Sequence, residues 1–265
     1  MTALAYRAEG SGEPVIFVHG WGLNSGVWKE QLKSLSDEFR VIAVDLPGHG
    51  RTKPKDKKMT VKAAAGFLRD LVDELALENV HLVGWSLGTH VVCRAALMLG
   101  FNTARSLTIV DGTPCFVQHN KEDNWAMQET RTKWVLRGLE NSFVDTLTEF
   151  ITTSCYTKKE VKPNIERMMQ SVFFNEHFPP DKKSAIELLT DFAESDIRPM
   201  LGKLKLPCLI CHGDRDSILP VEITKIWESF LPDARTVILE NAGHAPFLTQ
   251  PALFNESLRI FLHSA

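Results

Sequence analysis

Short apolar runs alternate with longer amphipathic stretches over most of the chain. Short runs rich in β-branched residues are typical of strands, and stretches with a period near 3.6 are typical of helices. The runs predict strands at Leu4–Ala8, Pro14–His19, Val41–Asp45, Val80–Trp85, Ser106–Asp111, Leu206–His212 and Ala234–Leu239. The amphipathic stretches predict helices at Val27–Leu35, Thr60–Leu77, Leu87–Leu99, Ile223–Phe230 and Pro251–Leu262. Such alternation favours an α/β fold, a mostly parallel central sheet flanked by helices.

The alternation is interrupted once, between Thr113 and Leu204, where the pattern is helical and no strand is predicted. Breaks are expected near Gly138–Asn141, Tyr156–Thr157 and Phe178–Pro180. The pattern therefore predicts a core made of residues 1–112 and 205–265, with a helical insertion over 113–204. Open α/β sheets bind ligands at the carboxyl ends of their strands. An insertion that follows such an end is a candidate lid.

Composition and charge narrow the range of functions. Apolar residues make up 44% and charged residues 24% of the 265 positions, as in ordinary globular proteins. The formal net charge is −3, so a protein that chiefly binds nucleic acid is not expected. We interpret the one strongly basic run, Arg51–Lys58, as a solvated loop, with a docking patch for an acidic partner as the alternative. No apolar run is long enough for a membrane helix, and the N-terminus lacks the apolar stretch of a signal peptide.

The chain has five cysteines, at positions 93, 115, 155, 208 and 211. Cys208-Leu-Ile-Cys211 has the C-x-x-C spacing but lies within a predicted strand, and no second pair completes a zinc site. We therefore expect buried, reduced thiols, no metal, and a cytoplasmic protein.

The strongest chemical signal is Gly84-Trp-Ser-Leu-Gly88, which follows a predicted strand and precedes a predicted helix. The G-x-S-x-G pattern in that context predicts a sharp turn that exposes a nucleophilic serine, Ser86. The two glycines leave space that side chains would fill. The helix N-terminus beneath the turn favours developing negative charge.

A serine nucleophile needs a base and an acid, which follow it in the order acid, then histidine. His244 falls in a loop between the last predicted strand and the last helix, so it is the predicted base. The acid should follow the strand that ends at His212. Asp214 and Asp216 both stand there; Asp216 is preferred because it comes later in the loop, and Asp214 is expected to brace the turn.

An oxyanion hole is predicted from the backbone N–H groups of Leu87 and Trp21. Trp21 lies in His19-Gly-Trp-Gly22, after an early strand. A dinucleotide-binding G-x-G-x-x-G would need glycine at position 25, where Ser25 stands, and no phosphate-binding loop motif is present. No cofactor is therefore expected.

Together these motifs resemble the α/β-hydrolase family over essentially the whole chain. Within it, the pattern is most similar to the pimeloyl-acyl-carrier-protein methyl ester esterases of biotin synthesis. The residues that carry this resemblance are His19-Gly-Trp-Gly-Leu-Asn24 with Trp28, Asp45-Leu-Pro-Gly48, Gly84-Trp-Ser-Leu-Gly88, and His244-Ala-Pro-Phe247 with Pro251.

The resemblance implies a monomeric serine carboxylesterase that needs no cofactor and takes its substrate from acyl-carrier protein. It implies that Ser86, Asp216 and His244 form the catalytic triad and that Trp21 and Leu87 contact the substrate carbonyl. It also implies that a lid segment lines the acyl channel; its residues are Phe150, Ile151, Thr152, Thr153 and Ser154.

The sequence departs from that family in two respects. Thr89 stands where the family usually has a second glycine after the turn. Residues 118–190 hold ten Lys or Arg against eleven Asp or Glu, although basic lid residues meet the acidic carrier in the family. Local basic clusters remain, at Arg131, Lys133 and Arg137 and at Lys158, Lys159 and Lys162. A broad carboxylesterase for free short-chain esters and a hydrolase-like ligand receptor stay open as alternatives.

Overall fold

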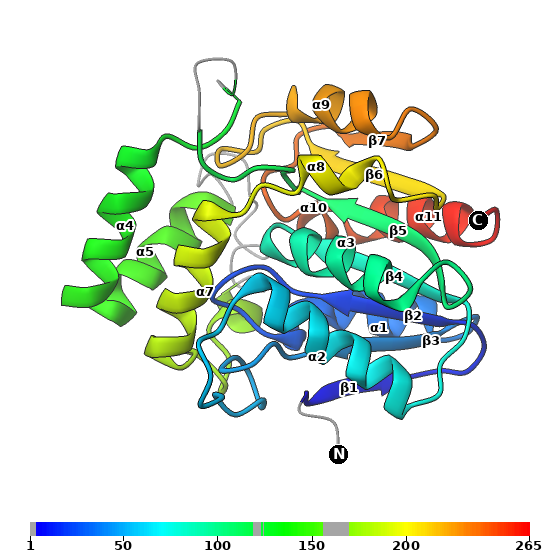
Figure 1. Cartoon of the computed structure of the whole chain (residues 1–265), viewed down its shortest axis with the longest axis horizontal. Coiled ribbons are helices and arrows are strands. Elements are labelled where there is room, and N and C mark those ends of the chain that lie inside the picture. Colours follow the sequence, from blue (N-terminus) through cyan, green and yellow to red (C-terminus); the bar gives the residue numbers. More distant parts are fainter. Residues whose placement is uncertain (1–3, 119–122, 124, 156–169) are drawn as a thin grey trace.

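The computed structural model describes residues 4–118, 123, 125–155 and 170–265, and these contain a central seven-stranded sheet (Figure 1). Its strand order is β1-β3-β2-β4-β5-β6-β7. Only the β1–β3 pair is antiparallel among the strand pairs of the described residues. The strands are β1 (Tyr6–Glu9), β2 (Pro14–Val18), β3 (Arg40–Val44), β4 (Val80–Trp85), β5 (Ala104–Val110), β6 (Cys208–Gly213) and β7 (Arg235–Leu239). This arrangement confirms the predicted fold class, and each predicted strand is present with its ends moved by two residues at most.

Burial explains why the central strands were easy to predict from sequence. Every residue of β2 and β4 is buried, because helices cover both faces of the sheet there. Strands buried on both faces have continuous apolar runs rather than alternating patterns. The edge strand β1 is largely exposed and the edge strand β7 is partly exposed, as edge positions allow.

Helices α2 (Val61–Glu74) and α3 (Leu87–Leu99) cover the front face of the sheet in Figure 1, and α1 (Lys29–Leu35) and α11 (Pro251–Leu262) cover the back. A further helix, α9 (Ile223–Phe230), packs on β6. The Thr60 side chain caps α2 by accepting from the Ala63 N–H at 3.0 Å, as its position before an apolar period predicts.

Two short helices differ from the prediction. The segment expected to begin a helix at Val27 starts as a 3₁₀ turn, η1 (Ser25–Trp28), because the Asn24 side chain accepts the Gly26 N–H and tightens the first turn. The region after His244 was expected to be a loop, but it contains α10 (Pro246–Thr249). Proline at the first helical position favours such a helix, because it has no N–H that needs a partner.

The described part of the segment between β5 and β6 holds helices and two isolated β-bridges, but no strand. Its helices are α4 (Glu129–Asn141), α5 (Phe143–Cys155), α7 (Lys182–Glu194) and α8 (Arg198–Leu201). The break between α4 and α5 falls at Ser142, directly after the predicted Gly138–Asn141. In Figure 1, α4, α5 and α7 lie together at one end of the sheet.

Helix α7 is fastened to the N-terminus of α2. The Glu187 carboxylate accepts the Met59 N–H at 2.7 Å, and the Asp191 carboxylate accepts the Val61 N–H at 2.8 Å. Carboxylates stabilise a helix N-terminus, where the first N–H groups have no partner within the helix. These bonds place α7 firmly against the core.

Other expectations concern thiols and membrane helices. Cys93, Cys115, Cys208 and Cys211 are buried and free, as predicted for these four. No helix among the described residues is long and apolar enough to cross a membrane.

The aromatic cluster behind the sheet offers a test of the fold. Trp28 is completely buried, with its ring 4.2 Å from Phe247 and 5.0 Å from Phe17 between centroids. Replacing such a side chain with alanine removes apolar contacts and leaves a cavity, so Trp28→Ala should lower the free energy of unfolding by about 3–5 kcal/mol. Equilibrium urea unfolding measures this. The matched control is Trp134→Ala: Trp134 is 62% exposed, so the change should stay within about 0.5 kcal/mol. Equal losses in the two variants would contradict the packing described.

Candidate active site

The predicted catalytic residues lie at the point in the sheet where successive strands are added on the opposite side of β2. The chain passes from β2 to β3 on one side and then returns to place β4 on the other side of β2. The loops after β2 and β4 therefore diverge, and the crevice between them is where open α/β sheets bind ligands. Trp21 follows β2 and Ser86 follows β4.

Ser86 occupies a strained turn between β4 and α3. Its backbone has φ 52° and ψ −118°, a conformation that residues other than glycine rarely adopt. The Ser86 N–H donates to the Val110 carbonyl at 2.9 Å, and its carbonyl accepts the Thr89 N–H at 3.0 Å. Strain of this kind persists only where the surroundings enforce it, and it clusters at functional sites. The turn predicted from G-x-S-x-G is present.

The glycines around the turn are required by close backbone approach. A Cβ at Gly84 would lie 2.5 Å from the Gly88 carbonyl oxygen, and one at Gly88 would lie 2.4 Å from the Val18 carbonyl oxygen. A Cβ at Gly20 would lie 3.3 Å from that of Ser86, so the loop after β2 passes directly beside the serine. Each glycine thus allows two backbone segments to meet at Ser86.

Thr89, which replaces the second glycine of the related esterases, is accommodated in a different way. Its hydroxyl donates to the Gly84 carbonyl at 3.0 Å. A Cβ at Gly112 would lie 2.3 Å from the Thr89 Oγ1, so that glycine supplies the space that the threonine needs. The departure from the family pattern therefore leaves the turn intact.

Asp216 and His244 are joined by a short hydrogen bond. His244 Nδ1 lies 2.6 Å from Asp216 Oδ2, and both side chains are almost completely buried. The other oxygen, Oδ1, accepts the N–H groups of Ile218 at 2.8 Å and Leu219 at 3.0 Å. Because the carboxylate accepts at Nδ1, His244 carries its proton there and its Nε2 is left as an acceptor.

Asp214, the alternative acid, braces the turn instead. It is exposed, its Oδ1 accepts the Ala242 N–H at 3.2 Å, and its own N–H donates to the Leu239 carbonyl. No bond joins it to His244.

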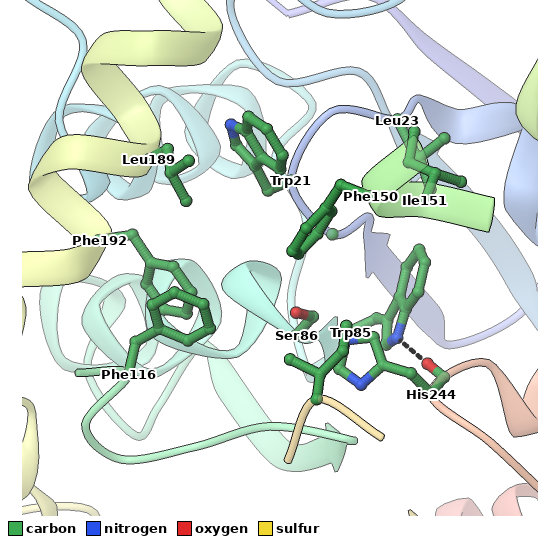
Figure 2. Close-up of a pocket in the computed structure, with 12 residues that line it drawn as sticks. Trp21, Leu23, Trp85, Ser86, Phe116, Phe150, Ile151, Leu189, Phe192 and His244 are labelled. Carbon is green, nitrogen blue, oxygen red and sulfur yellow. Dashed lines mark hydrogen bonds between the residues drawn. The ribbon is translucent and has the colours of Figure 1, made fainter. Parts of the chain in front are cut away.

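Trp85, the variable residue of the serine motif, supports the histidine loop. Its indole N–H donates to the His244 carbonyl at 2.6 Å, and its ring lies 5.7 Å from the His244 ring between centroids (Figure 2). From the back face, the Gln31 amide donates to the Phe247 carbonyl at 3.0 Å. The loop that carries the base is thus fixed on two sides.

The loop after β2 is held by a buried histidine. His19 Nδ1 lies 2.7 Å from the Gly20 carbonyl, and His19 Nε2 accepts the Leu46 N–H at 3.0 Å. Nδ1 therefore bears the proton. Burial lowers the pKa of His19, so the ring stays neutral and keeps this tautomer. Of the predicted oxyanion donors, Trp21 lines the same cavity as Ser86, and Leu87 is the first residue of α3, where N–H groups have no intrahelical partner.

A cavity opens over Ser86 and His244 (Figure 2). Apart from these two residues, the described lining is apolar or aromatic, with the Trp21 indole N–H bound to the Ala185 carbonyl at 2.8 Å. The Trp21 ring packs edge-on against Phe150, 5.5 Å between centroids. The other lining residues are Gly20, Leu23, Trp85, Phe116, Ile151, Leu189, Phe192 and Ile218.

The predicted lid residues divide into two groups. Phe150 and Ile151 line the cavity. Thr152 and Thr153 are not among the lining residues; their hydroxyls donate to the carbonyls of residues one turn earlier in α5, at 2.7 and 2.8 Å. The Ser154 side chain and residues Lys158, Lys159 and Lys162 lie outside the part of the chain that the structure describes.

Several cavity residues were not predicted. Leu189 and Phe192 lie three positions apart on α7, and Phe116 follows β5. Helical spacing shows that Leu189 and Phe192 share a face, but no feature of the sequence indicates that this face points toward Ser86.

One group of side chains has the composition of a metal site. An oxygen or nitrogen of each of Asp111, His212 and Asp216 lies within 4.8 Å of the others. However, both Asp216 oxygens accept hydrogen bonds, and His212 Nε2 donates to the Leu219 carbonyl at 2.9 Å. What remains is too few ligands for zinc, which takes three or four from a protein. The residues do not fit a bound metal.

Comparison with known proteins adds three findings. The profile of a family described as alpha/beta hydrolase fold matches residues 13–251. The chain is 31% identical to the pimeloyl-acyl-carrier protein methyl ester esterase of Aeromonas hydrophila subsp. hydrophila, over 96% of both chains. It is 29% identical to the enzyme of the same name from Nitrosomonas europaea, over 96% of this chain and 97% of that relative. Among solved structures, an esterase from Exiguobacterium antarcticum superposes with a TM-score of 0.90 at 23% identity, covering 98% of this chain and 95% of that one.

The Asp45 carboxylate next to the site offers a test of its electrostatics. It is buried and accepts the N–H groups of Ser25 at 2.7 Å and Arg51 at 3.2 Å. Burial alone raises the pKa of Asp45, but these N–H donors lower it overall. A carboxyl whose folded pKa is lowered stabilises the protein above its unfolded pKa, and this stabilisation is lost as the pH falls through the folded pKa.

Asp45→Asn should therefore lower the free energy of unfolding at pH 7 by about 2 kcal/mol, the typical contribution of a hydrogen bond to a charged group. The difference from wild type should shrink as the pH falls below about 4. Urea unfolding at several pH values measures both. A difference that stays constant down to pH 3 would show that Asp45 is not ionised in the fold.

Proposed function

The chain belongs to the alpha/beta hydrolase fold family, and from that premise we propose that it is a serine carboxylesterase with Ser86, His244 and Asp216 as its catalytic triad. The observation that carries the proposal is the 2.6 Å bond between Asp216 and His244, because His244 lines the same cavity as Ser86, which sits in a strained strand-to-helix turn. A neutral imidazole held in this tautomer can take a proton at Nε2, as nucleophilic catalysis by a serine requires.

In the proposed reaction, Ser86 Oγ attacks the ester carbonyl while His244 Nε2 takes its proton. The negative oxygen of the tetrahedral intermediate is stabilised by the N–H groups of Trp21 and Leu87. The intermediate collapses when His244 returns the proton to the departing alcohol, which leaves an acyl group on Ser86. Water, activated by the same histidine, then releases the carboxylic acid. Asp216 stays ionised throughout and stabilises the imidazolium.

The proposed substrate is the methyl ester of pimeloyl-acyl-carrier protein, which yields pimeloyl-acyl-carrier protein and methanol in biotin synthesis. Two near-full-length relatives bear the name of that activity. The apolar lining of the cavity supports this substrate. A methyl ester and a methylene chain are neutral, and their transfer from water into an apolar cavity lowers the free energy. Residues 113–204 would act as the lid over this chain, with Phe150 and Ile151 against it.

The carrier protein would remain outside and meet basic residues of the lid. Arg131 and Arg137 are exposed on α4, and the exposed Trp134 lies between them, three positions from each. Residues three apart share a helix face, so the three side chains form one basic and aromatic surface. An acidic carrier is complementary to it. The enzyme is proposed to work as a monomer in the cytoplasm, a compartment that suits four buried free thiols.

The triad is tested by three substitutions. Ser86→Ala should remove nearly all turnover of a short p-nitrophenyl ester. Asp216→Asn should lower kcat by about 10⁴, because the base then takes the wrong tautomer. Asp214→Asn is the matched control and should leave kcat within a few-fold, since that carboxylate braces a turn. Steady-state kinetics with melting temperatures separates catalysis from folding. Full activity in Ser86→Ala, or a larger loss in Asp214→Asn than in Asp216→Asn, would overturn the assignment.

Carrier docking is tested by charge reversal. Arg131→Glu combined with Arg137→Glu should raise KM for the carrier-bound methyl ester several-fold. Exposed charges act mainly on association and are screened by salt, so added salt should weaken wild type in the same way. The free methyl ester should be unaffected in both cases.

The control for docking is Lys53→Glu with Lys57→Glu, which reverses the other basic surface, within residues 51–58. If only this control impairs the carrier-bound substrate, docking occurs there. If wild type hydrolyses the free ester as efficiently as the carrier-bound one, the broad carboxylesterase is the better description.

A further inference from the structure

A second buried carboxyl group lies behind the proposed triad. Asp111 follows β5 and His212 lies in β6, and these strands are neighbours in the sheet, so the two side chains meet at its carboxyl edge beside Asp216. All three are buried, and neither Asp111 nor His212 takes part in the proposed reaction.

The hydrogen bonds of this pair leave one atom of each residue unsatisfied. Asp111 Oδ1 accepts the Gly213 N–H at 2.9 Å, and His212 Nε2 donates to the Leu219 carbonyl at 2.9 Å. Among the described residues, Asp111 Oδ2 and His212 Nδ1 have no partner. His212 Nδ1 lies 3.8 Å from Asp111 Oδ1. A buried polar atom without a partner is costly, so two such atoms on neighbouring side chains call for an explanation.

The positions of the protons explain why these two atoms have no partner. Since a carbonyl can only accept, His212 carries its proton on Nε2, and Nδ1 is an acceptor. An ionised Asp111 would offer only acceptors to it, and would also place a second negative charge beside Asp216. A protonated Asp111 has one donor, and His212 Nδ1 is an acceptor without a partner, 3.8 Å from Oδ1 of the same carboxyl group.

We propose that Asp111 is a neutral carboxylic acid at neutral pH, that it donates its proton to His212 Nδ1, and that it is a positioning residue for Asp216. The positioning runs through the backbone. His212 holds the Leu219 carbonyl, while the N–H groups of Ile218 and Leu219 hold Asp216 Oδ1. Asp111 also holds the other end of this loop through the Gly213 N–H.

The titratable surroundings agree with this protonation. Burial raises the pKa of Asp111 well above its usual value, and the nearby Asp216 charge adds to the effect. Burial lowers the pKa of His212, so the ring is neutral and cannot compensate a second carboxylate. Burial raises the pKa of the adjacent Cys211 thiol, which therefore adds no charge. His244 lies beyond Asp216 and bonds to it directly.

The backbone at Asp111 is a further sign that its side chain is needed. Its φ is +40°, in the left-handed region that few residues other than glycine, asparagine and aspartate adopt. Asparagine tolerates this conformation, accepts the Gly213 N–H through its oxygen and can donate its NH₂ to His212. Asp111→Asn is therefore the neutral mimic of the proposed state.

The first experiment measures stability and does not depend on the proposed function. A carboxyl whose folded pKa is raised stabilises the protein below its unfolded pKa, and this contribution is lost as the pH rises toward the folded pKa. Wild type should therefore lose stability relative to Asp111→Asn between pH 5 and 8. The ratio of their unfolding equilibrium constants should change by about tenfold per pH unit, as one proton requires.

Asp45→Asn is the matched control for this experiment. Asp45 is buried but ionised, so its ratio to wild type should be constant over the same range. A constant ratio for Asp111→Asn as well would mean that Asp111 is ionised in the fold, and would overturn the proposal.

The second experiment tests positioning and rests on the proposed esterase function. Asp111→Gly removes the carboxyl group but keeps the left-handed backbone, so it should lower kcat about 10-fold or more with KM nearly unchanged. Asp111→Asn should keep most of kcat. The apparent pKa of the acid limb of the kcat/KM profile should coincide for wild type and Asp111→Asn. If that apparent pKa is lower in Asp111→Asn, Asp111 carries charge in wild type. If Asp111→Gly keeps full kcat while stability behaves as predicted, Asp111 is neutral but does not position the acid. A protein without esterase activity would fail only this second experiment.

Discussion

The site depends on the turn at Ser86. Strand β4 is buried on both faces and ends at Trp85, and helix α3 begins at Leu87. Ser86 alone makes the turn between them, with a backbone φ of 52°. This geometry is possible only because Gly84 and Gly88 let backbone segments approach to distances that a Cβ would block. The result is a serine at the N-terminus of α3, beside the loop after β2. Once that position is fixed, the other elements of the site have a point toward which they converge.

The convergence is achieved by a few specific bonds rather than by general packing. Trp85, next to the serine, binds the His244 carbonyl, so one strand carries the nucleophile and supports the base. Trp21 ties the loop after β2 to α7 through the Ala185 carbonyl and packs against Phe150 of α5. The apolar roof of the cavity is thereby attached to the same loop that would supply an oxyanion donor. A substitution in α5 or α7 that moves Trp21 would therefore also move the proposed oxyanion donor.

The sequence predicted the parts of the site that follow from local pattern. The bounds of β4 and α3 were predicted correctly, and so were the turn between them and the presence of Asp216 rather than Asp214 on His244, because turn motifs and strand ends are local properties. The insertion was harder. Helical period shows which side chains share a face, but not where the face points. Thr152 and Thr153, expected in the acyl channel, do not line this cavity, while Leu189 and Phe192, which were not predicted, do. The bond between Gly213 and Asp111 was also missed, because it joins positions 102 apart through strand order.

The central claim is that Ser86 forms a covalent acyl intermediate. The most direct test is to treat the folded protein with an excess of a fluorophosphonate, an analogue of the tetrahedral intermediate that phosphonylates activated serines, and to analyse it by intact mass and peptide mapping. The account predicts one adduct per chain, located on Ser86, with loss of ester hydrolysis in proportion to labelling. An adduct on a different residue, or ester hydrolysis that persists in fully labelled protein, would contradict it.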